Sequence, residues 1–118
     1  MEAERETIMG RAIIKIKDYY LIWSSVVDAP VSFGMNRAEL EKWLKEEYGR
    51  AGLSDWLRMI PRVDEIGTSF YEHGSVKQTT RYNRAGPKGA RLTLDEIYTA
   101  YCLRKPIRDG WRPSEDEV

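Results

Sequence analysis

The sequence has few of the side chains from which catalytic and metal sites are built. Its 118 residues include one cysteine, Cys102, and one histidine, His73. A single cysteine excludes an internal disulfide framework and a zinc site made of thiolates. A single histidine excludes a metal centre with several imidazole ligands. We therefore expect no metal site, no cofactor and no enzymatic activity.

Long apolar runs and a surplus of charge of one sign are also missing. No apolar stretch approaches the roughly 20 residues that cross a bilayer, and the charged start of the chain lacks the apolar core of a signal peptide. Because 19 Lys and Arg residues balance 19 Asp and Glu residues, a broad nucleic-acid-binding surface is not expected either. These absences predict a cytoplasmic protein with neither a membrane nor a nucleic acid as partner.

The length and composition that remain are typical of one small α+β domain. With 42% hydrophobic and 32% charged residues, the chain is predicted to fold. We place the domain at residues 11–112, between a flexible N-terminal segment, residues 1–10, and an acidic tail, residues 113–118. The expected architecture is an antiparallel sheet of three to five strands, packed by two main helices and open on one face.

The strands are predicted mainly in the first third of the chain. Ile14 and Ile16 alternate with lysines, and residues 19–27 are rich in aromatic and β-branched side chains. Asp18, between these runs, marks either a tight hairpin turn or a bulge in one longer strand, and the sequence leaves both alternatives open. Further strand candidates are residues 66–71 and 75–82.

Two capping boxes predict the main helices. Asn36 is followed three residues later by Glu39, and Thr93 is followed in the same way by Glu96. In this motif each partner's side chain binds the other's backbone N–H at the start of a helix. A short additional helix is expected at residues 54–60, ended by the proline that follows it.

Basic residues gather in two places where few acids balance them. Residues 74–94 hold five basic side chains and no acidic one, and residues 104–112 form a second cluster. A local basic site in a neutral protein suits a small anionic ligand, because the planar arginine fork binds phosphate at two points. Tyr71 and Tyr82 lie near enough in the sequence to stack on a base. The plainer interpretation is a solvated loop with ordinary surface cations.

Other candidates have a structural and a functional interpretation. Trp23 is either a core residue or a platform on which a nucleobase stacks. Ser25, Asp28 and His73 can be combined into a hydrolytic triad, although such triads are recognised by geometry and not by spacing. Cys102 follows the apolar stripe of the last helix and is expected to be buried and inert.

Four segments resemble the phage-encoded Thoeris anti-defence sponge family. They are YYLIWSSVVDAPVSFGM at residues 19–35, a helix that ends in EYGR at 47–50, GTS at 67–69 and NRAGP at 83–87, so the resemblance covers residues 11–105. It matches Asn83 in the loop before the last helix and Arg104 at the end of that helix. The family's second arginine, one turn before Arg104, corresponds to Ala100, and Arg108 is the candidate to replace it.

The resemblance implies a protein that sequesters an immune signal without cleaving it. Such proteins bind cyclic ADP-ribose isomers made by a bacterial defence system, and some also hold cyclic oligonucleotides. They form dimers or hexamers with pockets between subunits, in the cytoplasm of an infected host cell. The arginines are expected to neutralise a diphosphate, the asparagine to bind a ribose or base edge, and the aromatic pair to stack on adenine. The residues implied for this site are Trp23, Arg81, Tyr82, Asn83, Arg84, Arg104 and Arg108.

Other functions remain open at this point. The chain has four tryptophans and seven tyrosines, more than one small core encloses, which predicts a homo-oligomer with aromatic residues at its interface. The same surplus fits a protein that inhibits a host factor by direct binding. A small hydrolase that uses His73 and a nucleic-acid binder are further alternatives.

Overall fold

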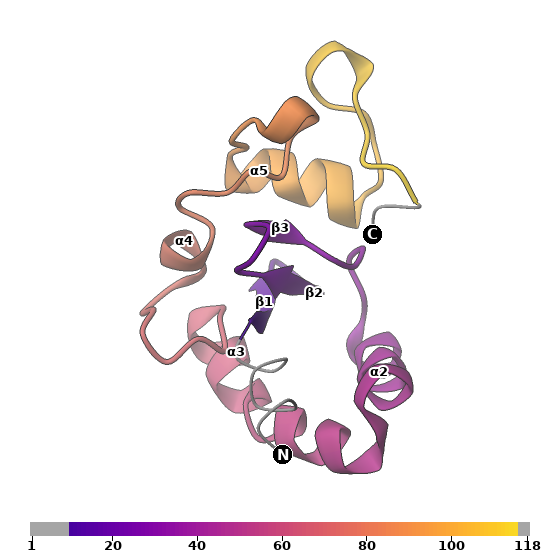
Figure 1. Ribbon diagram of the computed structural model, residues 1–118, viewed down its shortest axis with the longest axis vertical. Coiled ribbons are helices and arrows are strands. Elements are labelled where there is room, and N and C mark those ends of the chain that lie inside the picture. The colour runs from indigo at the N-terminus through magenta and orange to yellow at the C-terminus, as the bar shows by residue number, and fades with distance from the viewer. Residues whose placement is uncertain (1–9, 116–118) are drawn as a thin grey trace.

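A β-hairpin forms the centre of the fold (Figure 1). β1 (Arg11–Ile16) pairs antiparallel with β2 (Tyr19–Ser24), and β3 (Ala29–Pro30) adds to the other edge of β2. Lys17 adopts a φ of 55° in the turn that joins the first two strands. The hairpin is therefore the correct one of the two alternatives at Asp18, and the predicted small antiparallel sheet is confirmed.

The structure, a computed structural model, describes residues 10–115. The segment expected to be flexible, residues 1–10, lies outside this range except for Gly10, and so does the end of the predicted acidic tail. Within the described part of that tail, Pro113 is buried and Glu115 forms an ion pair with Arg104. No helix in the described range combines the length and the apolar composition needed to cross a membrane.

Two helices cover one face of the sheet. α2 (Arg37–Leu57) begins with the predicted capping box and is interrupted at Gly49, whose φ is 73°. α3 (Ile60–Ile66) follows after a short turn. The separate helix expected at residues 54–60 is wrong, because its first residues belong to α2. Pro61 does not end a helix but lies in the first turn of α3, where the N–H it lacks has no intrahelical partner.

Short helical turns cover the other face. α4 (Val76–Thr79) and α5 (Leu94–Ile97) are separated by a loop, and α5 begins with the second predicted capping box. A π-helical turn, η2 (Tyr98–Cys102), continues α5. Two further 3₁₀ turns, η1 (Pro87–Gly89) and η3 (Arg108–Gly110), lie in the loops on either side. The strand expected at residues 75–82 is wrong, and of the one expected at residues 66–71 only an isolated antiparallel bridge between Thr68 and Ile14 of β1 is present.

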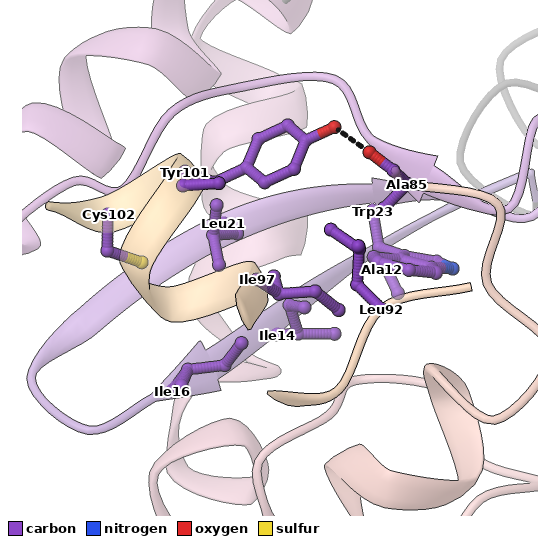
Figure 2. Packing of buried hydrophobic residues seen from close by; sticks show 11 residues of the cluster. Ala12, Ile14, Ile16, Leu21, Trp23, Ala85, Leu92, Ile97, Tyr101 and Cys102 are labelled. Atoms are coloured by element: carbon purple, nitrogen blue, oxygen red, sulfur yellow. Dashed lines mark hydrogen bonds between the residues drawn. The ribbon is translucent and has the colours of Figure 1, made fainter. Parts of the chain in front are cut away.

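The hairpin divides its side chains between two hydrophobic cores, since neighbouring residues of a strand point to opposite faces. Towards α2 and α3 the sheet contributes Ile13, Tyr20 and Ile22. Towards α5 and η2 it contributes Ala12, Ile14, Ile16, Leu21 and Trp23, and there the Tyr101 hydroxyl donates to the Ala85 carbonyl oxygen at 2.7 Å (Figure 2). A strand buried on both faces explains the nearly continuous apolar run of β2.

Both sheet faces are thus covered within one chain, and the expectation of an open face is wrong. Two tryptophans are accommodated in full, because Trp23 and Trp56 are each only 1% exposed. The sheet therefore offers no uncovered face for a second subunit. The predicted homo-oligomer stays a prediction, and any interface must use other surfaces.

Candidate functional site

A groove with two compartments lies beside the end of β2. The first, which we call the Trp56 pocket, has a volume of about 540 Å³ and is bounded by the end of α2, the start of β1 and the loop at residues 69–73. The second, the Arg81 pocket, has a volume of about 320 Å³ and is bounded by β2, the β2–β3 turn and α4. Ser25, Phe70 and His73 line both compartments, so the two are neighbours. Both volumes suit small-molecule ligands.

Arg62 on α3 holds the loop that forms the wall between the compartments. Its guanidinium group donates to the carbonyl oxygens of four loop residues, at 3.1 Å for Thr68, 2.7 Å for Phe70, 3.2 Å for Tyr71 and 2.8 Å for His73. The same group lies 5.3 Å from the centroid of the Tyr71 ring. Hydrogen bonds from a charged donor are stronger than neutral ones, so Arg62 fixes the shape of the groove.

A chain of side-chain hydrogen bonds orients His73 in this wall. The Thr79 hydroxyl donates to Thr68 Oγ1 at 2.7 Å, and Thr79 Oγ1 lies 2.8 Å from His73 Nδ1. These two bonds fix the orientation of the imidazole ring between the two compartments.

The Arg81 pocket brings together three of the seven predicted site residues: Trp23, Arg81 and Tyr82. The Arg81 guanidinium lies 5.1 Å from the centroid of the Tyr82 ring, which is 73% exposed. Among the described ion pairs Arg81 has no carboxylate partner, although Asp28 lines the same pocket. The pocket therefore offers an uncommitted cation, an open aromatic face and a carboxylate acceptor.

Trp56, which lines the first pocket, carries a donor that is unpartnered and closed off from solvent. Trp56 is almost fully buried, and its indole Nε1 is the only buried side-chain nitrogen or oxygen in residues 10–115 without a hydrogen-bond partner. Leaving such a donor unpaired costs about 1–3 kcal/mol. Ser69, on the same pocket, accepts from Ile13 N through its Oγ at 2.9 Å and donates to no described residue.

Asn83, another predicted site residue, is fully engaged in its own loop. Its Nδ2 donates to the carbonyl oxygens of Thr80 and Leu92, both at 2.8 Å. Its Oδ1 accepts from Leu92 N at 2.8 Å and from Ala85 N at 3.3 Å. Because both amide hydrogens are used and the side chain is 3% exposed, Asn83 organises the loop at residues 83–92 and leaves no N–H for a ligand.

The three remaining predicted arginines lie outside the groove. The Arg84 guanidinium packs beside Gly89. Arg104 lies 3.9 Å from the centroid of the Phe33 ring and pairs with Glu115 at 2.8 Å. Arg104 lines a different hollow, beside Arg112. Within one chain, the predicted arginines therefore do not converge on a shared cavity.

Arg108 is committed to Glu96. Its Nε and Nη2 donate to the two carboxylate oxygens of Glu96 at 2.6 and 2.8 Å, and Nη2 also donates to the Arg91 carbonyl oxygen. The bond from Arg108, with the Thr93 backbone N–H, lowers the pKa of Glu96 to about 2. The same ion pair raises the pKa of Arg108. This bidentate pair joins the start of α5 to the C-terminal loop.

The residues considered for a hydrolytic triad meet in one pocket without forming one. Ser25, Asp28 and His73 all line the Arg81 pocket. The Ser25 hydroxyl donates to the Gly10 carbonyl oxygen at 3.1 Å, and His73 Nδ1 is bonded to Thr79 and not to a carboxylate. Burial raises the pKa of Cys102 to about 12, so that its thiol is not a nucleophile. Among residues 10–115 no group of three or more His, Cys, Asp or Glu side chains is placed to hold a metal ion.

Two residues that shape the groove, Arg62 and Trp56, could not be identified from the sequence. Arg62 was not distinguishable from other surface arginines, because the carbonyl oxygens it binds carry no sequence signal. Trp56 has the pattern of an ordinary apolar helix residue, and only its surroundings show that its N–H is left over. His73 is a candidate in the sequence, but nothing there indicates that its hydroxyl partner is Thr79, which is bonded in turn to Thr68.

No protein-family model, curated protein or solved structure matches this chain. The fold and the groove therefore stand on the geometry described above.

Proposed function

We propose that this protein binds a small anionic, nucleotide-like ligand in the Arg81 pocket and sequesters it without cleaving it. The sequence resemblance suggests the ligand class, cyclic ADP-ribose isomers or related cyclic nucleotides, and the role of a phage anti-defence sponge. The observation that carries the proposal is the pairing of an uncommitted guanidinium, that of Arg81, with the exposed ring of Tyr82 at the mouth of a pocket.

Each group in the pocket suits one part of such a ligand. Arg81 can bind a phosphate at two points. The Tyr82 ring, most of which is exposed, can stack on a base, and Asp28 can accept hydrogen bonds from ribose hydroxyls. Trp23 supports the pocket from the core and presents little surface of its own. This set binds and orients a nucleotide but leaves few groups for chemistry on it.

Sequestration rather than turnover is supported by the state of the candidate catalytic groups. The Ser25 hydroxyl donates to a backbone carbonyl oxygen, and within residues 10–115 no carboxylate is bonded to His73. A hydrolase of this type needs a base within hydrogen-bond reach of its nucleophile, with a third group that orients the base. His73→Ala separates the two possibilities, because it abolishes turnover in an enzyme, whereas in a sponge the ligand stays intact with either side chain.

Calorimetry with cyclic ADP-ribose isomers tests the proposal. We expect binding by the wild-type protein and affinity about tenfold or more weaker in Arg81→Ala, since a charge-assisted hydrogen bond is lost. Arg50→Ala, an exposed arginine on α2 that lines neither compartment, is the matched control and should bind as wild type. Mass spectrometry of ligand released by heat should find it intact. No binding, or equal losses in both variants, would contradict the proposal, and a linear product would indicate an enzyme.

A protein partner is the second candidate function. Four exposed hydrophobic side chains border the groove. Val26 and Val27, 82% and 53% exposed, form the tip of the β2–β3 turn between two groove residues, and Tyr71 and Tyr82 are 80% and 73% exposed. Clustered exposed apolar groups mark interaction surfaces. A host factor that copurifies with the wild type, is lost with Val26→Asp and is retained with Arg81→Ala would favour this function over sequestration.

Homo-oligomerisation is kept as part of the proposal. The same exposed rim is a surface that a second copy can cover, as a dimer or within a hexamer. Sedimentation velocity of the wild type and of Val26→Asp tests it. A larger species in the wild type that dissociates in the variant is expected, and a wild-type monomer at every concentration would contradict it.

A further inference from the structure

We propose that the hollow between α4 and the start of α5 is a second anion site, for a chain of two or more linked phosphates. This hollow, which we call the Arg91 hollow, has a volume of about 430 Å³ and is lined by residues 77–81 and 91–94 except Thr79. The inference goes beyond the proposed function, because a phosphate chain without a base is enough to occupy the site. The observation behind it is a lining with three cations and no carboxylate.

The charged side chains of the Arg91 hollow are all positive. They are Lys77, Arg81 and Arg91, and all three residues are exposed. None of them belongs to an ion pair within residues 10–115. The other three hollows described above each have a carboxylate in their lining, from Glu72, Asp28 or Glu115. Because like charges in one hollow repel each other, the Arg91 hollow favours a ligand with several negative charges.

The acidic side chains nearest in the sequence do not neutralise these cations. Both carboxylate oxygens of Glu96 accept from Arg108. Asp95 does not line the hollow and forms no ion pair with any described residue. The three positive charges are therefore left for a ligand.

The backbone holds the two cations that the Arg81 pocket lacks. Lys77 lies on α4, which begins with a side-chain cap. The carbonyl oxygen of Arg91 accepts from Arg108 Nη2 at 3.0 Å. The next residue, Leu92, is bonded through its N–H and its carbonyl oxygen to the Asn83 side chain. Because these backbone positions are set before binding, less conformational entropy is lost when a ligand binds.

The arrangement favours linked phosphates over a single phosphate. One phosphate can take both donors of a single guanidinium, and a second, linked phosphate brings further oxygens for the remaining cations. Arg81 and Gln78 line both the Arg91 hollow and the Arg81 pocket, so the two are neighbours. The phosphate chain can therefore be free or can belong to a nucleotide whose base lies in the Arg81 pocket.

The test is a titration with inorganic pyrophosphate at low ionic strength, followed by two-dimensional nitrogen–proton NMR of the arginine Nε–H signals. The signal of Arg91 is the one that Arg91→Gln removes. We expect pyrophosphate to shift it saturably and to bind at least about threefold more tightly than inorganic phosphate, with an affinity that falls as sodium chloride is added. The signal of Arg50, exposed on α2, should stay in place. Equal shifts of the Arg50 and Arg91 signals would overturn the inference.

Matched variants, followed at the Arg81 Nε–H signal, decide whether the cations of the hollow form the site. Arg91→Gln and Lys77→Gln should each weaken pyrophosphate binding about threefold to tenfold. Lys45→Gln, at an exposed lysine on α2, should bind within about twofold of wild type. The inference is wrong if Arg91→Gln binds as wild type or loses no more affinity than Lys45→Gln.

Tyr82→Ala separates this site from the nucleotide pocket, because it removes a ring of the pocket and no side chain of the hollow. Pyrophosphate should bind this variant as it binds wild type, and a loss as large as that in Arg91→Gln would contradict the inference. Pyrophosphate binding by a protein that binds no cyclic ADP-ribose isomer would contradict the proposed function and support this site. ADP that binds more tightly than pyrophosphate, and loses this advantage in Tyr82→Ala, would assign the chain to a nucleotide. Equal affinities would assign it to a free phosphate chain, and both results support the site.

Discussion

The two basic regions of the molecule use arginine in opposite ways. In the C-terminal region, Arg104 pairs with Glu115 and Arg108 forms a bidentate pair with Glu96. In the groove, Arg81 contacts an aromatic ring and has no ion-pair partner among the described residues. The difference teaches that a basic cluster in the sequence indicates a binding site only where its charges are left uncompensated by the fold.

The aromatic residues of the Arg81 pocket are also of two kinds, one buried and one exposed. Substitutions at these two residues should give the largest difference in the free energy of unfolding. Trp23→Ala should lower the free energy of unfolding by about 3–5 kcal/mol, because it empties a large buried site. Tyr82→Ala, at an exposed ring of the same pocket, should change it by less than about 0.5 kcal/mol. Urea unfolding of both variants measures the difference. Similar small effects would mean that Trp23 is not part of the core.

Arg62 and Arg81 should differ next in their contribution to stability, because Arg62 binds the backbone of the loop and Arg81 is free to bind a ligand. Arg62→Met should cost about 3 kcal/mol, because four carbonyl oxygens lose a charged donor, and it should speed amide hydrogen exchange in residues 70–74. Arg81→Met should stay within about 0.5 kcal/mol of wild type. The account of the groove fails if the Arg62 variant keeps both its stability and its exchange protection.

Asn83 and Arg84 are neighbours in the sequence, and their alanine variants should differ by a smaller amount in the free energy of unfolding. Asn83→Ala leaves backbone groups of the 83–92 loop unpaired and should cost about 2 kcal/mol. Arg84→Ala should be nearly neutral in stability. Thermal unfolding followed by circular dichroism measures both. If the Asn83 variant is as stable as wild type but does not bind the ligand, Asn83 is a binding residue and not a structural one.

The Arg108–Glu96 pair should have the smallest effect on the free energy of unfolding, and the effect should depend on pH. Because the folded-state pKa of Glu96 is about 2, below the ordinary value of 4.5, its contribution is complete above about pH 4.5 and is lost as the pH falls towards 2. We expect less than about 1 kcal/mol, since Arg108 is nearly half exposed. Urea unfolding between pH 5 and 2 should show a shallower decline in Glu96→Gln. Identical slopes would contradict the assignment.

Local signals in the sequence were sufficient for part of the fold. The two capping boxes and the alternating residues of the hairpin depend on neighbours within a few positions, and all three predictions are confirmed. The segment at residues 75–82 was misjudged because its β-branched Val76, Thr79 and Thr80 favour a strand. In the structure the Ser75 side chain accepts from Gln78 N and starts a helical turn, and Val76 packs against the hydrophobic core.

The site was less predictable than the fold. Arginines in one stretch of sequence diverge in space, and whether each finds an acid depends on long-range packing. Trp23 and Asn83 looked chemically suitable, but the sequence does not show that one is in the core and the other is saturated by backbone groups. Arg81 and Tyr82 stay together because they are adjacent on one exposed turn.

The central claim is that the uncommitted arginine of the groove, rather than the paired arginines of the C-terminal region, binds the anionic ligand. Calorimetric titration of Arg81→Ala, Arg104→Ala and Arg108→Ala with the same cyclic ADP-ribose isomer tests it most directly. The account predicts affinity about tenfold or more weaker for the Arg81 variant and within about twofold of wild type for the other two. Binding retained by the Arg81 variant and lost with Arg104 or Arg108 would contradict it.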